Sequence, residues 1–199
     1  MSLAHQPCGD CGSSDALLIN DDGSTKCYSC GVFHPAKESK EIELSKDFIK
    51  GVARDIADRC ITQETCRRYK YNIGTYKGKE VQIATYRDLD GNPKFQKIRF
   101  TDEKSFITIG KFEPLLYGMN NFKGNDKKLI ITEGEIDCLS ISQVINGYPV
   151  VSIPNGANNA KEAIKHNLEW LERFDEIVFC FDMDRVGQEA VKECAALLS

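Results

Sequence analysis

Hydrophobic residues in the last third of the chain fall into short continuous runs separated by longer, more polar stretches. The strands predicted around these runs cover residues 127–132, 149–153 and 176–181, and the stretches expected to be helical cover 135–146, 160–174 and 187–198. Continuous apolar runs of this length are typical of strands buried on both faces of a parallel sheet. Strands that alternate with helices over short links imply right-handed parallel crossovers. The pattern predicts a parallel α/β subdomain over residues 126–199, with Ile136, Leu139, Ser140 and Val144 facing inward from its first helix.

The middle of the chain, residues 47–125, alternates apolar and polar positions instead. Three stretches, 71–76, 80–86 and 93–100, alternate in this way, and Asp90-Gly91-Asn92 forms a turn before the last of them. Such alternation predicts antiparallel strands. Apolar residues between positions 45 and 60 recur with a helical period, and a second short helix is expected to begin at Thr62–Thr65, with either threonine as its cap. We therefore expect a small α+β subdomain with a curved antiparallel sheet.

Residues 1–35 contain two Cys-x-x-Cys pairs, Cys8/Cys11 and Cys27/Cys30, separated by fifteen residues. Between the pairs, residues 17–20 and 25–28 are predicted to form a hairpin around the favoured turn dipeptide Asp22-Gly23. Four thiolates at this spacing can close tetrahedrally on one Zn²⁺ ion. The pattern predicts a zinc ribbon whose folding free energy comes from its metal, because the module has few apolar residues to bury.

Two interpretations of the ribbon remain open. Many zinc ribbons are purely structural. Alternatively, the hairpin presents side chains to single-stranded DNA, and His34, just after the second pair, is expected at the surface rather than among the ligands. The candidate DNA-contacting residues are Asp22, Ser24, Lys26, Tyr28 and Phe33. Residues 36–46 are polar and mixed in charge, which predicts a flexible linker between the ribbon and the rest of the chain.

Composition and charge narrow the class of protein. The chain has 199 residues, of which 41% are hydrophobic and 28% charged, so it is expected to be globular. It has neither an apolar run of 18 residues nor a signal-peptide pattern, which predicts a cytoplasmic protein without membrane contact. The nine cysteines favour metal binding and buried thiols over disulfides in that compartment.

The net charge of −4 is unevenly distributed, with −4 on residues 1–44, +6 on 45–125 and −6 on 126–199. A basic segment beside an acidic one suits a metal-dependent enzyme that acts on polyphosphate or nucleic acid, although many other proteins share this feature. No Gly-x-x-x-x-Gly-Lys-[Ser/Thr] motif occurs, which excludes a P-loop nucleotide site of that type.

Carboxylates follow two of the predicted parallel strands, with Glu133 after the first and Asp182 and Asp184 after the third. Open α/β sheets bind their ligands at the carboxyl ends of strands. Three carboxylates in one crevice would repel each other unless a divalent cation such as Mg²⁺ lay between them. Asp137 lies one helical turn beyond Glu133 and can face the same crevice. The loop at Asn155-Gly156 could let a phosphate or a base approach the backbone closely. The alternative is that the acids are ordinary solvated residues.

Basic residues line the last strand of the middle subdomain and the loop beyond it. Lys97 and Arg99 alternate with apolar neighbours and project to one face, Lys104 can swing in from the loop, and Lys111 follows. One interpretation is a cationic wall that neutralises triphosphates or a template backbone. A solvated strand face is equally consistent with the pattern.

Together these motifs resemble a known family. The Thr-Glu133-Gly-Glu-x-Asp137 and Phe-Asp182-x-Asp184-x-x-Gly187 segments resemble the two motifs of the Toprim fold, which primases, topoisomerases and some nucleases share. With the preceding ribbon, linker and basic segment, the chain resembles the primase half of phage primase–helicase proteins. The run from Lys104 to Gly118 also resembles a segment of bacterial replicative primases.

The resemblance implies template-directed synthesis of short RNA primers from ribonucleoside triphosphates on single-stranded DNA, in a phage-infected bacterial cell, with a fused or separate replicative helicase as partner. It implies that Glu133, Asp182 and Asp184 hold catalytic Mg²⁺ or Mn²⁺ and that Asp137 assists them. It also implies that the ribbon reads the initiation trinucleotide. The residues carried over as basic nucleotide-binding positions are Lys97, Arg99 and Lys104.

Two departures qualify this resemblance. Ser24 stands where the best-known phage relatives have a histidine that helps to read the template, which leaves the recognition sequence open. The chain also ends in the third helix, where the family continues to a further acidic strand, so either the chain is a trimmed piece of a longer protein or the further acid comes from elsewhere. The alternatives are a Toprim nuclease, disfavoured by the ribbon and the basic segment, and a recombination clamp, disfavoured because the cysteines begin at residue 8.

Overall fold

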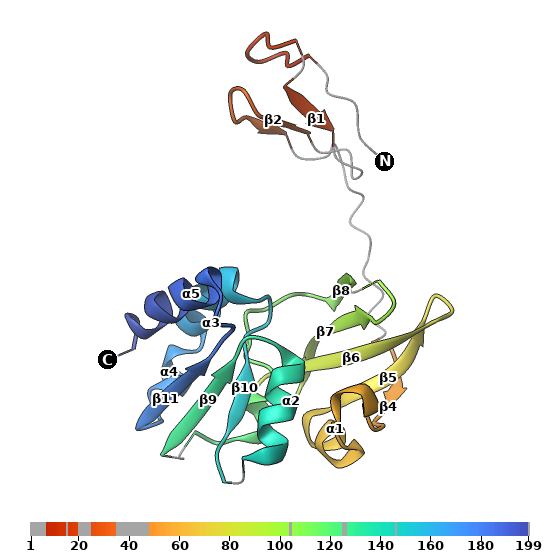
Figure 1. The fold of residues 1–199 in the computed structure, drawn as a ribbon, viewed down its shortest axis with the longest axis vertical. Helices are drawn as coiled ribbons and strands as arrows, with labels where there is room; N and C mark the ends of the chain where they lie inside the picture. Colours follow the sequence, from red (N-terminus) through yellow and green to blue (C-terminus); the bar gives the residue numbers. More distant parts are fainter. Residues whose placement is uncertain are drawn as a thin grey trace. The chain divides into compact units, whose positions relative to one another are not determined.

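The chain folds into two compact units, Met1–Leu44 and Ser45–Ser199. The computed structural model describes residues 7–14, 16–19, 25–34, 48–103, 105–124, 127–145 and 147–198. Figure 1 shows a small β unit that carries the first residues and a larger α/β unit that carries the remainder. The predicted linker over 36–46 lies outside the described residues, so that boundary stays a prediction.

The first unit is a three-stranded antiparallel sheet with the order β1-β2-β3, built from β1 (Leu17–Ile19), β2 (Thr25–Cys27) and β3 (Phe33–His34). The predicted pairing of the first two strands is confirmed, with Leu17 opposite Cys27. The third strand was not predicted, because two residues are too few to show alternation. Gly12 and Gly31, which follow the two cysteine pairs, have φ angles of 72° and 75°, a left-handed conformation that glycine adopts at little cost.

The second unit begins with a five-stranded antiparallel sheet. The three predicted strands are confirmed as β5 (Tyr71–Tyr76), β6 (Lys79–Arg87) and β7 (Pro93–Phe100). The edges are β4 (Gly51–Val52) and β8 (Ser105–Gly110), and β8 occupies residues that we had placed in a loop. Helix α1 (Gln63–Tyr69) begins after Thr62, whose side chain accepts a hydrogen bond from the Thr65 backbone N–H, so Thr62 is the cap.

The predicted helix between positions 45 and 60 is wrong over the described residues. Val52 pairs with Ile73 in β4, Ile56 forms a β-bridge with Ile61, and only the 3₁₀ turn η1 (Ala57–Arg59) is helical. Phe48 packs instead on a small apolar cluster beneath the antiparallel sheet. The apolar spacing therefore reflects contacts with two different cores rather than one helical face.

The remainder of the second unit is a parallel sheet with the order β10-β9-β11, formed by β9 (Lys128–Thr132), β10 (Val150–Ser152) and β11 (Glu176–Cys180). Helix α2 (Glu135–Val144) lies between this sheet and α1, as Figure 1 shows. The last helix is α5 (Arg185–Ala195). The predicted strands and these two helices are confirmed, but Val144 is 74% exposed rather than inward.

The predicted helix over 160–174 is two helices, α3 (Ala160–His166) and α4 (Leu168–Leu171). The break falls at Asn167, which is buried. Its side-chain amide donates hydrogen bonds to the carbonyls of Ala163 at 2.7 Å and Pro114 at 2.8 Å. Asn167 thereby ties the helical layer to the segment that follows the antiparallel sheet.

One hydrophobic core runs through both sheets of the second unit. It includes Tyr86 and Phe95 from the antiparallel sheet and Leu129 and Ile131 from the parallel sheet. Tyr117, at the start of the segment carrying η2 (Met119–Asn121), exchanges backbone hydrogen bonds with Ser152 of β10 at 2.8 and 3.2 Å. The two sheets are thereby fixed relative to each other. Among the described residues, no helix combines the length and apolar character needed to cross a membrane.

Candidate functional site

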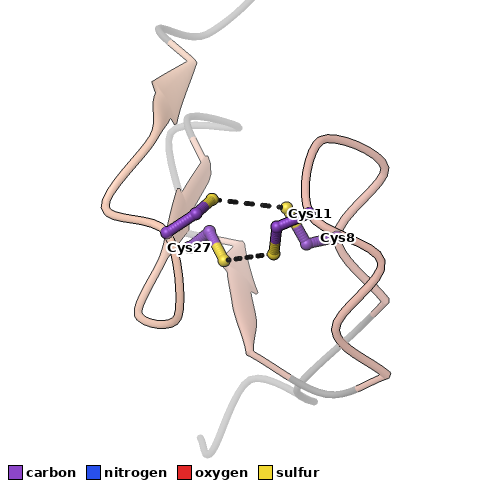
Figure 2. Close-up of side chains that lie close together, drawn as sticks. Cys8, Cys11 and Cys27 are labelled. Carbon is purple, nitrogen blue, oxygen red and sulfur yellow. Dashed lines mark hydrogen bonds between the residues drawn. The ribbon is translucent and has the colours of Figure 1, made fainter.

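The four predicted metal ligands converge in the first unit. The Sγ atoms of Cys8, Cys11, Cys27 and Cys30 all lie within 4.8 Å of one another. The distance is 4.0 Å between the sulfurs of Cys8 and Cys30 and 3.7 Å between those of Cys11 and Cys27. Figure 2 shows the sulfurs of Cys11 and Cys27 facing each other, with Cys8 beside them. Zn–S bonds of about 2.3 Å in a tetrahedron require sulfurs about 3.8 Å apart. The cysteine geometry therefore fits one zinc ion.

The thiols of this cluster also influence each other's protonation. Hydrogen bonding from the Cys30 backbone N–H lowers the pKa of Cys27 to about 7. The backbone N–H of Val32 favours the Cys30 thiolate, yet hydrogen bonding to the Cys27 sulfur and burial raise the Cys30 pKa to about 12. The thiolate of Cys27 therefore disfavours ionisation of the Cys30 thiol. A bound cation would offset the repulsion between the two negative charges.

The remaining predicted residues of the ribbon are only partly described. Lys26 and Tyr28 are exposed, and the Lys26 ammonium lies 5.5 Å from the centroid of the Tyr28 ring. Asp22 and Ser24 lie outside the described residues, as do the side chains of Phe33 and His34.

The second unit contains a cavity of about 550 Å³ where the antiparallel sheet meets the carboxyl ends of β9 and β11. Most of the predicted acidic and basic residues lie on its walls. One wall comes from residues of the antiparallel half, namely Arg59, Tyr71, Ala84, Lys97, Arg99 and Phe106. The opposite wall comes from the parallel half, namely Glu133, Gly134, Glu135, Ile136, Asp137, Asn155, Gly156 and Asp182.

Glu133 is held in place by backbone groups from two neighbouring loops. Its Oε1 accepts a hydrogen bond from the Ala157 N–H, and its Oε2 accepts one from the Asp182 N–H, both at 3.3 Å. Ala157 opens η3 (Ala157–Asn159), directly after Gly156 with a φ angle of 68°. A Cβ atom at Gly156 would lie 3.7 Å from Glu133 Oε1. The tight loop thus brings an amide to the carboxylate.

Asp137 and Asp182 complete the acidic wall. Partial burial raises the pKa of Asp137, and the carboxylates of Asp182 and Glu133 raise it further. A Cβ atom at Gly134 would lie 2.9 Å from Asp137 Oδ2, so a larger residue there would push this carboxylate away. The crowded negative charge and oxygen ligands suit Mg²⁺. Among the described residues, however, only the cysteines bring three ligand atoms within 4.8 Å of one another.

Asp184 has a different environment. It caps α5, where its Oδ1 accepts a hydrogen bond from the Gly187 N–H at 2.8 Å, and it does not line the cavity. A Cβ atom at Gly187 would lie 2.2 Å from the Asp182 carbonyl oxygen. The local structure therefore explains the Asp-x-Asp-x-x-Gly spacing. Asp184 caps the helix, and position 187 requires glycine because the backbone of Asp182 passes too close for a side chain.

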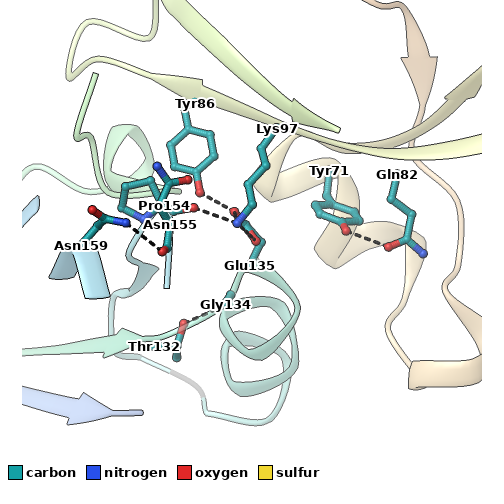
Figure 3. Close-up of polar contacts among 10 residues, drawn as sticks. All are labelled: Tyr71, Gln82, Tyr86, Lys97, Thr132, Gly134, Glu135, Pro154, Asn155 and Asn159. Carbon is teal, nitrogen blue, oxygen red and sulfur yellow. Dashed lines mark hydrogen bonds and ion pairs between the residues drawn. The ribbon is translucent and has the colours of Figure 1, made fainter. Parts of the chain in front are cut away.

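Lys97 does not project freely into the cavity. Its ammonium lies 2.9 Å from Glu135 Oε1 and 3.2 Å from Oε2, and it donates a hydrogen bond to the Pro154 carbonyl at 2.7 Å. The buried Tyr86 hydroxyl donates to the same Glu135 carboxylate (Figure 3). Glu135 is not among the site residues predicted from the sequence. Its place in the Glu-Gly-Glu motif was visible, but its partners lie far away in the chain.

The other basic residues are placed differently from Lys97. Arg99 lines the cavity, and its buried Nε atom has no hydrogen-bond partner among the described residues. Lys111 is exposed just after β8 and does not line the cavity. Lys104 lies outside the described residues. The loop of Asn155 and Gly156, which was predicted to let a phosphate or a base approach the backbone closely, does line the cavity.

Comparison with known proteins identifies the family. Residues 51–110 match the family described as "Bacteriophage T7 DNA helicase/primase, N-terminal a+b fold", and residues 130–199 match the Toprim-like family. The primase fragment of the bacteriophage T7 primase–helicase protein is 36% identical, with 99% of this chain and 86% of that fragment covered and a TM-score of 0.73. This chain belongs to the phage T7-type DNA primase family. The predicted resemblance and fold class are both confirmed.

Two further relatives show the extent of the match. The DNA helicase/primase of Enterobacteria phage T3 is 34% identical to this chain, with 98% of this chain but 38% of the phage T3 protein covered. The chain thus spans well under half of that relative. Primase domains seen with the phage T7 lagging-strand DNA polymerase are 38% identical over 75% of this chain and 76% of theirs, with a TM-score of 0.68. That polymerase–primase complex also contains an RNA/DNA hybrid and dTTP.

Proposed function

We propose that this chain is the catalytic part of a DNA primase, a nucleotidyltransferase that makes short RNA primers on single-stranded DNA from ribonucleoside triphosphates. The observation that carries the proposal is the 36% identity to the phage T7 primase fragment along 99% of the chain. The cavity adds independent support, because the carboxylates of the parallel half lie across it from the cations of the antiparallel half. Metal-assisted phosphoryl transfer requires this combination.

The acidic wall has the oxygen ligands that a divalent metal requires. Glu133 and Asp182 are the principal candidates to hold Mg²⁺ or Mn²⁺, with Asp137 beside them and Asp184 at the adjacent helix cap. The bound metal would polarise the triphosphate and offset charge on the leaving group. The two backbone amides at Glu133 orient its carboxylate. Because Ala157 and Asp182 belong to different loops, Glu133 links the positions of both.

The basic wall would bind the triphosphate. Arg99, whose guanidinium offers a fork of donors and lines the cavity, is the best-placed phosphate ligand. In the reaction, the primer 3′-oxygen forms a bond to the α-phosphorus, the bond between the α-phosphorus and the bridging oxygen breaks, and pyrophosphate leaves. Lys97 keeps its ammonium against Glu135 and the Pro154 carbonyl, where it orders the loop that bears Asn155 and Gly156.

The four-cysteine ribbon would hold one Zn²⁺ ion and read the template initiation site, through exposed residues such as Lys26 and Tyr28. The phage T3 relative is a DNA helicase/primase of which this chain covers 38%. We therefore propose that a helicase works with this primase, fused to it or as a separate protein.

One experiment tests the reaction and its template preference together. The protein is incubated with a random single-stranded DNA library, four ribonucleotides and Mg²⁺ or Mn²⁺, and all products are sequenced. Oligoribonucleotides that start opposite one trinucleotide are expected. Degraded template without new RNA would contradict primase activity and favour a Toprim nuclease.

Asp182→Asn provides the matching test of the metal site. The change removes one negative charge from the cavity and keeps the side-chain volume, so primer synthesis should fall at least a hundredfold while zinc content and thermal stability stay unchanged. Asp175→Asn is the control, because Asp175 is an exposed aspartate at the opposite end of β11. Undiminished synthesis by Asp182→Asn would refute the role of Asp182.

A further inference from the structure

On strand β8, Phe106 is a large apolar residue at a position where the alternation of apolar and polar residues predicts a polar side chain. Ile107 and Ile109 on this strand pack on the small apolar cluster beneath the sheet, so the alternate positions, Phe106 and Thr108, face the other way. Threonine is usual at such an outward position. Phe106 is 51% exposed and lines the cavity. Its large apolar ring therefore contributes little to the core, and another explanation for the residue is needed.

The neighbours of the ring are cations. Phe106 lies directly opposite Arg99 in the register between β7 and β8. The Lys97 ammonium lies 5.0 Å from the ring centroid, and the Arg99 guanidinium carbon lies 5.9 Å from it. These distances fall within the range of cation–π attraction. The two cations flank the ring, yet Phe106 stays half exposed where it lines the cavity.

A single ligand would suit both the ring and the guanidinium beside it. An aromatic ring that is half uncovered suits a flat π-system, and the guanidinium of the adjacent Arg99, which lines the same cavity, suits an anion. A nucleotide carries both groups, joined through its sugar. The acidic wall with Glu133 and Asp182 lies across the cavity, where a metal would bridge to the same phosphates.

We propose that Phe106 is a nucleobase subsite, on which the base of a ribonucleoside triphosphate stacks while Arg99 contacts its phosphates. This inference rests on the proposed function and deepens it, because it assigns a binding surface to the base. Stacking on a ring does not distinguish one base from another. Phe106 therefore provides affinity for all four nucleotides, and the choice among them is left to the template.

The test compares a ligand that has a base with one that lacks it. Binding of ATP and of ribose 5-triphosphate is measured by isothermal titration calorimetry with Mg²⁺, for the wild-type chain and for Phe106→Ala. We expect Phe106→Ala to raise the Kd for ATP about tenfold. The Kd for ribose 5-triphosphate should not change, because that ligand has no base to stack.

Conservative variants and a matched control separate stacking from folding. Phe106→Tyr keeps the π-face and should bind ATP like the wild type, whereas Phe106→Leu keeps apolar bulk only and should behave like Phe106→Ala. Phe112→Ala serves as the control, because Phe112 is also exposed, at 37%, but does not line the cavity. It should leave ATP binding unchanged.

Several results would overturn the proposal. Equal losses for both triphosphates would assign Phe106 a general structural role. Weaker binding of a single-stranded oligodeoxynucleotide, with ATP binding intact, would place the ring against the template instead. If the wild-type chain makes primers and Phe106→Ala binds ATP normally, only this inference fails. If the wild-type chain binds neither triphosphate, the proposed function fails with it.

Discussion

At the scale of single residues, the buried carboxylate of Glu135 connects parts of the site that lie far apart in the sequence. It receives hydrogen bonds from Tyr86 of β6 and Lys97 of β7, and Lys97 in turn reaches the Pro154 carbonyl. Three residues after Pro154, the Ala157 amide donates to Glu133. Glu135 thus helps to place a candidate metal ligand that it does not touch.

Glu135→Ala should destabilise the fold strongly. The side chains of Lys97 and Glu135 are only 15% and 9% exposed, so removing the carboxylate leaves a buried ammonium without its partner. The expected loss is about 3 kcal/mol in the free energy of unfolding, measured by urea denaturation. The double variant Lys97→Met with Glu135→Leu should recover much of this loss, because it removes both charges and fills the space.

A surface ion pair provides the control for this prediction. Lys128 and Glu176 lie 3.0 Å apart with side chains 33% and 56% exposed. Glu176→Ala should therefore cost less than about 1 kcal/mol. Equal costs for the changes at Glu135 and Glu176 would show that burial of the first pair contributes nothing.

At the scale of elements, Asp184 is predicted to contribute to stability as well as to any chemistry. Its hydrogen bond to the Gly187 N–H caps α5. Asp184→Ala should lower the free energy of unfolding by about 1 kcal/mol, whereas Asp184→Asn keeps a cap and should cost much less. Thermal denaturation of the two variants measures the difference.

This pair of variants also separates the cap from metal binding. If Asp184 holds metal, both variants should lose primer synthesis, although only Asp184→Ala loses stability. A stable Asp184→Asn protein with normal synthesis would limit Asp184 to its structural role.

The sequence predicted correctly those helices and strands whose residues all pack in the same surroundings along their length. Residues 93–100 alternate along their whole length, and β7 has these bounds. The stretch before residue 60 has the apolar spacing of a helix without forming one, because Val52 pairs with a strand while Ile56 enters the main core. The break between α3 and α4 at Asn167 could not be predicted from the sequence either, since the Pro114 carbonyl that accepts a hydrogen bond from its amide lies 53 residues earlier.

The candidate site was predictable to the same extent. Carboxylates after buried strands and alternating cations are local patterns, and they placed Glu133, Asp182 and Arg99 on one cavity. The pairing of Lys97 with Glu135 spans 38 residues and depends on how two sheets pack. Local spacing carries no information on such a contact, so Lys97 was expected to be a free cation.

At the scale of the whole molecule, the two units have different sources of stability. The first unit gathers four cysteines around a candidate zinc site, and the second has a continuous core built from both of its sheets. Loss of metal should therefore unfold the first unit and leave the second intact. The nine cysteines are distributed over both units and can report on each.

Alkylation with iodoacetamide at pH 8, followed by mass spectrometry, reads out both units at once. Cys60 and Cys180 are exposed and should react first. Burial raises the pKa of Cys66 and of Cys194 to about 11, and raises that of Cys138 as well. These three thiols stay protonated at pH 8 and should resist, because the thiolate is the reactive form and appears only as the pH rises toward the raised pKa.

The zinc-site cysteines give the decisive comparison. Cys11 is exposed, so bound metal rather than burial must protect it in the native protein. A chelator should make all four ribbon cysteines reactive and leave Cys66, Cys138 and Cys194 protected. Rapid alkylation of Cys11 without chelator would contradict the zinc site. Exposure of Cys66 after chelation would instead show that the second unit depends on the ribbon for its stability.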